Sequence, residues 1–206
     1  MDELPLADEL KSFALSAVSA VEGALIVARI VRPNTDVEWC RAELRCLAGK
    51  AGSGAAPVEL VDYLRAQGFA GAEAYYDADN SSLECVLRTR RGIPITLAMV
   101  VVGTAECLGM TATGINFPGH FMVSLDGRLF DPFKMQPIDA AGRRTWLTWS
   151  GADEKIAFKS ATPVDVVLRM LNNLRALARS RGDHESALKL TNYQLIVSPD
   201  PLPIHV

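Results

Sequence analysis

A histidine and an aspartate occur at a spacing that could bring their side chains together on one face of a β-sheet. Asp126-Gly127 is a strong signal for a two-residue hairpin turn, because both turn positions need a left-handed backbone that these residue types tolerate. That turn places Met122 opposite Asp131, so His120 and Asp131 become diagonal neighbours on the same face. A carboxylate beside an imidazole fixes the tautomer of the ring and supports its protonated form, as in catalytic triads. The pair is therefore either a catalytic dyad or a structural histidine satisfied by a neighbouring acid.

Two residues with nucleophilic side chains lie near each other in the chain and could work with such a pair. Thr96 belongs to the first turn of a helix that is predicted to begin at Pro94. Its hydroxyl is either a nucleophile or the ordinary polar group of a helix start, bonded to backbone N–H groups. Cys85 precedes this helix and is either a displaced thiol nucleophile or a buried side chain. The remaining cysteines are predicted to pack within helices; they are Cys40, Cys46 and Cys107.

Arginines just before the same helix could bind an anion. Arg88, Arg90 and Arg91 lie close together in the chain, and the helix that follows offers free backbone N–H groups at its start. An anion bound by these guanidinium groups and the helix N-terminus is physically reasonable. The alternative is a solvated basic face, or ion pairs from these arginines to Asp77 and Asp79.

The residues before His120 could shape the mouth of a pocket. Asn116 and the segment 117–119 form either such a rim or a simple turn. Trp146 and Trp149 are expected to cover a hydrophobic core rather than to bind a ligand. The chain has 3 histidines and 4 cysteines and contains no CxxC motif, so neither a metal site nor a cofactor is expected.

The elements that must position these residues follow from the apolar spacing. It predicts helices over 8–31, from 36 onward, over 57–67, 81–90 and 94–108, and a helix pair over 163–197 with a break at 180–183. Strands are predicted over 110–115, 121–125 and 128–133, and further strands over 146–158. The helix that begins at Pro94 is apolar nearly all round, so it is expected to be the buried central element.

Composition limits the class of protein. The 206 residues fit one domain, or one domain with a small addition, and 49% hydrophobic with 22% charged residues excludes a wholly disordered chain. The net charge of −3 argues against a general nucleic-acid or anionic-membrane binder. The longest apolar run, from Leu97 to Val102, is too short to span a bilayer, and no signal peptide is evident. These features favour a cytoplasmic protein.

Several short motifs in a fixed order resemble a known family. The chain reads DxxNSxL over 77–83, RRGIPITL over 90–97, FPGHF over 117–121 and DPF over 131–133. It is similar in these motifs to the bacterial SirB-type proteins of the transglutaminase-like superfamily. MLNNL over 170–174 and RGD over 181–183 resemble the tetratricopeptide-like C-terminal part of those proteins. The likeness covers most of the chain, and RRGIPI and FPGHF are specific when they occur together in this order.

The resemblance implies a set of site residues. The superfamily uses a Cys-His-Asp triad for acyl transfer or amide hydrolysis. Its cysteine stands at the start of a helix, where the helix dipole and free N–H groups lower the thiol pKa. The histidine of the triad corresponds to His120 and the aspartate to Asp131, whereas the cysteine corresponds to Pro94. Proline has no nucleophile, so the thiol mechanism lacks its essential residue in this chain.

These features together predict an α+β fold. It consists of a transglutaminase-like (papain-like) core with N-terminal helices over 1–160, a tetratricopeptide-like helix pair over 161–198 and a tail over 199–206. Pro94 favours a non-catalytic regulatory or protein-binding module that retains a His–Asp site and takes a protein or peptide partner. The alternative is a hydrolase or acyl-transferase that uses Thr96 or a displaced thiol. The oligomeric state is left open.

Overall fold

The fold is a mixture of helices and short strands, as the sequence predicts. A computed structural model describes residues 5–16 and 18–198 of the chain. The helices are α1 (Ala7–Ser16), α2 (Ala20–Val31), α3 (Val37–Ala51), α4 (Pro57–Ala66), α5 (Leu83–Thr89), α6 (Pro94–Cys107), α7 (Ala140–Ser150), α8 (Glu154–Ala157), α9 (Pro163–Ser180), α10 (His184–Val197) and the 3-10 helix η1 (Ala78–Ser81). The strands are β1 (Ala70–Gly71), β2 (Arg91–Gly92), β3 (Ala112–Ile115), β4 (Met122–Leu125), β5 (Arg128–Asp131) and β6 (Gln136–Pro137).

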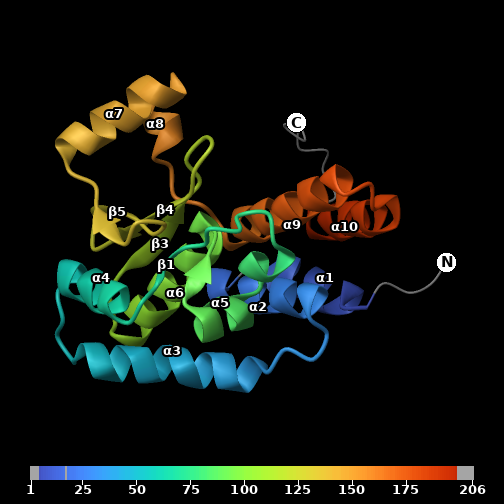
Figure 1. The fold of residues 1–206 in the computed structure, drawn as a ribbon, viewed down its shortest axis with the longest axis horizontal. Coiled ribbons are helices and arrows are strands. Elements are labelled where there is room, and N and C mark those ends of the chain that lie inside the picture. The colour runs from blue at the N-terminus through green and yellow to red at the C-terminus, as the bar shows by residue number, and fades with distance from the viewer. Residues whose placement is uncertain (1–4, 17, 199–206) are drawn as a thin grey trace.

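Helix α6 is the central element, as its apolar sequence predicts. Pro94 is its first residue, and every residue from Pro94 to Ala105 is buried. The helix packs against α2, α3 and α5, and its other side contacts β3 and β4, as Figure 1 shows. A helix that is hydrophobic all round is stable only when neighbours cover it on all sides, and this arrangement supplies them.

The sheet has the register that the hairpin signal predicts. Strands β3, β4, β5 and β6 pair in that order, all antiparallel. Leu125 lies opposite Arg128, and the two turn residues between them have positive φ angles, 46° at Asp126 and 80° at Gly127. Both turn residues are therefore in the left-handed region that the two-residue hairpin requires. The short parallel pair of β1 and β2 was not predicted.

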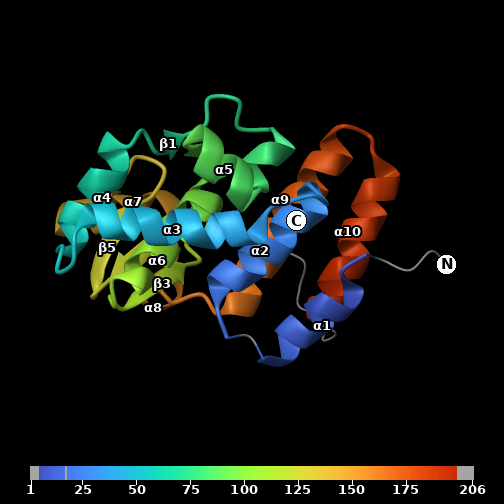
Figure 2. The ribbon, with the colours of Figure 1, turned by 90° about the horizontal axis from the view of Figure 1, so that it is seen from below.

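The C-terminal helices pack on the N-terminal ones. Helix α9 lies along α2 and α10 lies beside α1, as Figure 2 shows. The contact with α2 is close, because a Cβ atom on Gly23 would lie 2.4 Å from Cγ2 of Val167. Side chains from α9, among them Val166 and Met170, belong to the same hydrophobic cluster as those of α6. Among the described helices, none has the length and apolar character needed to cross a membrane.

Two predicted elements are wrong. The helix over 8–31 is two helices, because the Ser19 side chain accepts hydrogen bonds from the backbone N–H groups of Val21 and Glu22 and so begins a new helix. The strands over 146–158 are helices α7 and α8. Each of these helices begins at an aspartate cap, Asp139 and Asp153, whose carboxylate accepts a backbone N–H. These local caps favour helix over strand. The predicted tail over 199–206 lies outside the described residues.

Candidate functional site

The His120 and Asp131 side chains form a hydrogen bond. His120 lies just before β4, and Asp131 ends β5. Nε2 of His120 is 2.9 Å from Oδ1 of Asp131, and the same oxygen accepts the backbone N–H of Phe133 at 2.9 Å. The Asp131 side chain is 3% exposed and the His120 side chain 13%. A carboxylate only accepts, so Nε2 is assigned as the protonated ring nitrogen. The hairpin register therefore places the two side chains together, as the sequence predicts.

An aromatic side chain covers the imidazole. The ring of Trp146 is stacked on that of His120, with centroids 4.7 Å apart and an angle of 16° between the planes. Trp146 also meets Phe117 edge to face, with centroids 5.6 Å apart. Trp149 lies against the turn before His120, since a Cβ atom on Gly119 would be 2.7 Å from its ring. Trp146 thus covers the site itself, while Trp149 is 62% exposed.

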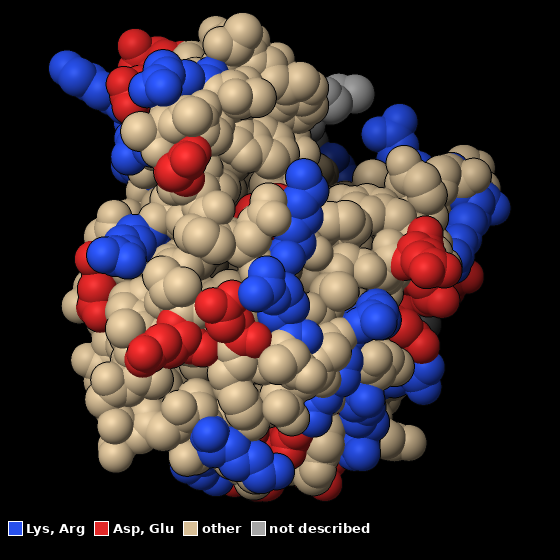
Figure 3. All heavy atoms as spheres, turned by 60° about the vertical axis from the view of Figure 1, so that its left-hand side comes forward, with Lys and Arg blue, Asp and Glu red and all other residues tan. Residues whose placement is uncertain are grey.

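Both tryptophans belong to a segment that packs separately from the main core. This segment, residues 138–160, carries α7 and α8 and is called the arm below. It packs on Ile115, Phe117 and Met122, which form a small buried cluster together with Ala157 of α8. None of the α7 residues is fully buried. The arm is the lobe at the top of Figure 3, and the face in that view mixes acidic and basic side chains.

Arg169 of α9 holds the loop that carries His120. Arg169 of α9 donates from Nη1 to Oδ1 of Asn116 at 2.6 Å and to the carbonyl oxygen of Phe117 at 3.4 Å. Its Nη2 donates to the carbonyl oxygen of His120 at 3.3 Å. Asn116, a predicted binding residue, is therefore bonded to α9. Sequence reasoning missed Arg169, although it is a charged residue at the edge of the apolar stripe that contains Val166 and Met170.

A second loop is held by Asn80 of the DxxNSxL motif. The side chain of Asn80 donates to the carbonyl oxygens of Ala74 and Tyr75, at 2.7 and 3.3 Å. Those bonds fix the loop before η1 and place the Tyr75 ring near Phe133, with centroids 6.3 Å apart. Tyr75 is 44% exposed, and its partial burial raises the pKa of its phenol. Sequence reasoning assigned no role to Tyr75, because nothing in the spacing of the residues indicates this contact.

Gly71 allows the chain after Asp131 to approach β1. A Cβ atom on Gly71 would lie 2.2 Å from the Phe133 ring, and the backbone N–H of Gly71 donates to the Phe133 carbonyl oxygen. We expect Gly71→Ala to lower the free energy of unfolding by about 1–3 kcal/mol, because Phe133 must leave its position. Urea unfolding followed by tryptophan fluorescence measures the change.

Gly49→Ala is the matched control, since nothing lies within 4 Å of a Cβ atom there. It should leave the stability unchanged or raise it. Gly71→Ala combined with Phe133→Leu should recover part of the loss, because the smaller side chain relieves the contact. A stable Gly71→Ala variant would contradict the close packing of Phe133.

The two candidate nucleophiles are not joined to His120. The Thr96 side chain is fully buried, and its hydroxyl has no hydrogen-bond partner among the described residues. The Cys85 thiol lies instead beside the ion pair between Arg32 and Asp79, whose closest atoms are 2.5 Å apart. Hydrogen bonds from Arg32 lower the pKa of Asp79, and the thiol adds to that effect. Cys85 lines a surface hollow of about 780 Å³, and His120 is not among the residues that line it.

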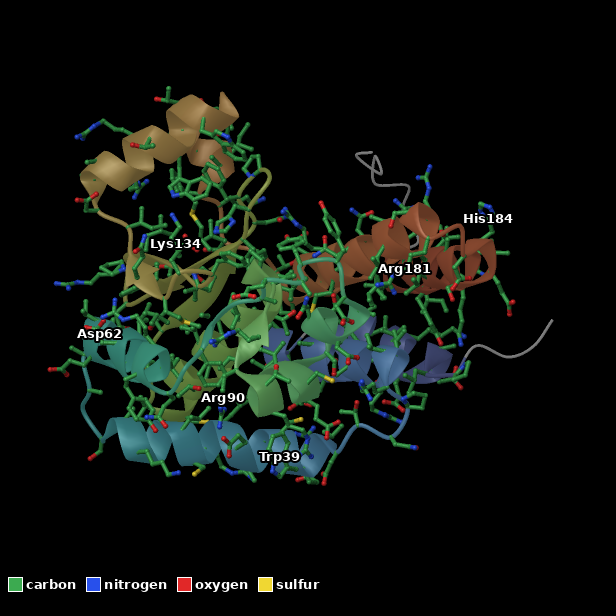
Figure 4. All side chains as sticks on the ribbon, viewed as in Figure 1. Trp39, Asp62, Arg90, Lys134, Arg181 and His184 are labelled. Carbon is green, nitrogen blue, oxygen red and sulfur yellow. The ribbon has the colours of Figure 1, made fainter. Side chains whose placement is uncertain are left out.

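The predicted basic cluster is paired within the protein. Nη2 of Arg90 is 2.6 Å from Oε1 of Glu43 on α3, and Figure 4 shows Arg90 above that helix. Arg88 pairs with Glu84 at 2.8 Å. Arg91 donates to the carbonyl oxygens of Gly68 and Arg90. The ion pairs go to glutamates rather than to Asp77 and Asp79, and the guanidinium groups of Arg90 and Arg91 are already bonded to oxygens of the chain.

The arrangement can donate and accept hydrogen bonds at an aromatic surface. His120 supplies an oriented imidazole, Asp131 fixes it, and Trp146 and Tyr75 contribute ring faces. Within the described residues, no group of three or more histidine, cysteine, aspartate or glutamate side chains could bind a metal ion.

The sequence matches one family model and several known proteins. A family model described as "Transglutaminase-like superfamily" matches residues 41–172, a range that contains both His120 and Asp131. A UPF0162 protein of Vibrio cholerae is 28% identical over 208 residues, which are 89% of this chain and 75% of that protein. A UPF0162 protein of Xylella fastidiosa is 28% identical over 225 residues, 96% of this chain and 78% of that protein. F-box only protein 21 of Homo sapiens is 32% identical over 133 residues, 59% of this chain and 20% of that protein. No solved structure matches the chain.

Proposed function

Since the chain belongs to the transglutaminase-like superfamily, we propose that it is a non-catalytic member that binds a protein or peptide partner at its His120–Asp131 site. The observation that carries this proposal is the residue at the start of α6. The motif resemblance puts the superfamily's cysteine at Pro94, and Pro94 is the first residue of that helix. A thiolate at this position is what acyl transfer by the superfamily requires.

The two possible replacements support the same conclusion. The buried Thr96 hydroxyl has no hydrogen bond to an imidazole that could take its proton. The Cys85 thiol is engaged with Arg32 and Asp79. A general base must lie within hydrogen-bond reach of the proton that it removes, and neither group has that contact with His120.

The retained pair suits recognition. Asp131 orients the imidazole, so the second ring nitrogen is available to a partner's hydrogen-bonding group. Exposed aromatic side chains nearby, Tyr75, Tyr76 and Trp149, supply the apolar contacts that anchor many protein interfaces. We propose further that the chain is a SirB-type protein and that α9 and α10 form a tetratricopeptide-like helix pair. The same proposal places the protein in the cytoplasm.

An amine-incorporation assay tests the proposal. The full chain is incubated with a glutamine-containing peptide and a labelled amine, and we expect no labelled product. The same assay is run on His120→Ala, Cys85→Ser and Thr96→Val. Turnover that disappears with both His120→Ala and Cys85→Ser would establish a displaced thiol and overturn the non-catalytic assignment. Turnover that is lost with Thr96→Val and is indifferent to thiol reagents would establish a hydroxyl nucleophile instead.

A further inference from the structure

Arg169 carries a positive charge that no acidic side chain of the described residues neutralises. Its hydrogen bonds go to three neutral oxygens, on Asn116, Phe117 and His120. Each of the ion pairs found in the described part of the chain involves other residues. Burial lowers the pKa of Arg169, and Tyr75 is the titratable group that acts on it. Largely buried charges are nearly always paired, so an arginine without an acidic partner beside a candidate site is well suited to bind an anionic group.

The guanidinium has donors left for such an anion. It carries five N–H groups, and the three hydrogen bonds to the loop all come from Nη1 and Nη2. The Nε donor and one Nη2 donor have no partner among the described residues. Two donors are enough for the paired hydrogen bonds that arginine forms with a carboxylate.

The surroundings favour a peptide rather than a small inorganic ion. Arg169 contacts the His120 loop, and the phenol of Tyr75 lies near enough to act on its charge. The Tyr75 loop passes close to α9, as Figure 1 shows. Arg181, the residue after α9, donates to the carbonyl oxygen of Tyr76. Tyr75 and Tyr76 meet edge to face, with centroids 5.4 Å apart, and both are exposed. A cation flanked by exposed aromatic rings suits a carboxylate attached to an apolar group.

We propose that Arg169 binds a carboxylate of the peptide partner and so anchors that partner beside His120. This inference rests on the proposed binding function. The carboxylate is either the C-terminus of a peptide or an aspartate or glutamate side chain, because both present the same two oxygens. A role limited to fixing the His120 loop would need no ligand.

Titration of the full chain with short peptides tests the inference. The probes are N-acetyl-Gly-Phe with a free carboxylate, the same peptide as its amide, and N-acetyl-Glu-Phe amide. The readouts are the NMR signals of the arginine Nε–H and tryptophan indole N–H groups. We expect the free acid to shift the Arg169 Nε–H and Trp146 signals in a saturable way, and the Gly-Phe amide to leave them unmoved. Shifts by the Glu-Phe amide would identify a side-chain carboxylate, and shifts by the free acid alone a C-terminal one.

Variants of α9 supply the matched comparison. Arg169→Gln should weaken binding of the acid by about tenfold or more, because it removes hydrogen bonds to a charged group. Arg169→Lys should weaken it less, since the charge stays but the two-donor geometry is lost. Arg175→Gln is the control, because Arg175 lies on the same helix and bonds to Asn172. It should bind as the unaltered chain does.

If neither the Gly-Phe acid nor the Glu-Phe amide shifts these signals of the unaltered chain more than the Gly-Phe amide does, the inference is overturned, whether or not Arg169→Gln folds. Unchanged binding in a folded Arg169→Gln variant would overturn it as well. Those results would leave the non-catalytic proposal intact. Amine incorporation in the enzyme assay would overturn the proposed non-catalytic function. Carboxylate-dependent shifts of the NMR signals would still support carboxylate binding by Arg169.

Discussion

Asp131→Ala should lower the free energy of unfolding by about 3 kcal/mol. The substitution removes the oxygen that accepts hydrogen bonds from the His120 ring and from the backbone N–H of Phe133. The N–H group of Phe133 is left without its partner in a mostly buried position, and an unsatisfied buried donor costs roughly 1–3 kcal/mol. Urea unfolding followed by the fluorescence of Trp146 and Trp149 measures the loss.

Asp131→Asn separates the hydrogen bonds from the charge. The asparagine retains one carbonyl oxygen, so it should cost about 1–2 kcal/mol, less than alanine. His120→Ala leaves the Phe133 bond in place and should also cost less than Asp131→Ala. If Asp131→Ala were as stable as the unaltered chain, the pair would make no net contribution to the fold, and the role of Asp131 in fixing the loop after β5 would be wrong.

Stability should fall steeply in alkaline solution because of Cys40. This thiol is completely buried, and burial raises its pKa to about 12. In the unfolded chain the thiol titrates near its ordinary pKa of about 8.5. Between the two values the unfolded chain has lost a proton that the folded chain still binds. The free energy of unfolding therefore falls by about 1.4 kcal/mol for each pH unit in that window.

The measurement compares urea unfolding at pH 8 and at pH 10.5. We expect the free energy of unfolding to drop by about 2–3 kcal/mol more in the unaltered chain than in Cys40→Val. Tyrosines also titrate in this range, and burial raises the pKa of Tyr75 and Tyr193. Their contribution is common to both chains and cancels in the comparison. Identical pH dependence would show that the Cys40 thiol ionises freely in the folded protein.

The hairpin and the central helix could be predicted because each depends on local sequence. The Asp126-Gly127 turn determines which residues face each other, so the contact between His120 and Asp131 follows. The apolar sequence after Pro94 determines that α6 is buried. The motifs predicted the superfamily, and the match over residues 41–172 confirms it.

The rest of the site depends on contacts between distant parts of the chain. Arg169 reaches the His120 loop from 49 residues further along the chain, and no periodicity reports such a bond. Strands were predicted over 146–158, within the arm, because the apolar residues there were considered without the caps at Asp139 and Asp153. The stacking of Trp146 on His120 follows only once the arm is known to be helical. Local sequence signals therefore predicted the contact between His120 and Asp131, whereas tertiary packing determines which residues surround that pair.

The packing of α2 on α9 has a consequence for the synthesis of the protein. The ribosome completes α2 at Val31, long before α9 begins at Pro163. At ordinary rates of translation, of the order of 10 residues per second, the apolar face of α2 waits roughly ten seconds for its partner. During that interval the face is available to chaperones that bind nascent chains. A stalled or shortened chain that ends before α9 would keep this face exposed, and quality-control proteases would be expected to remove it.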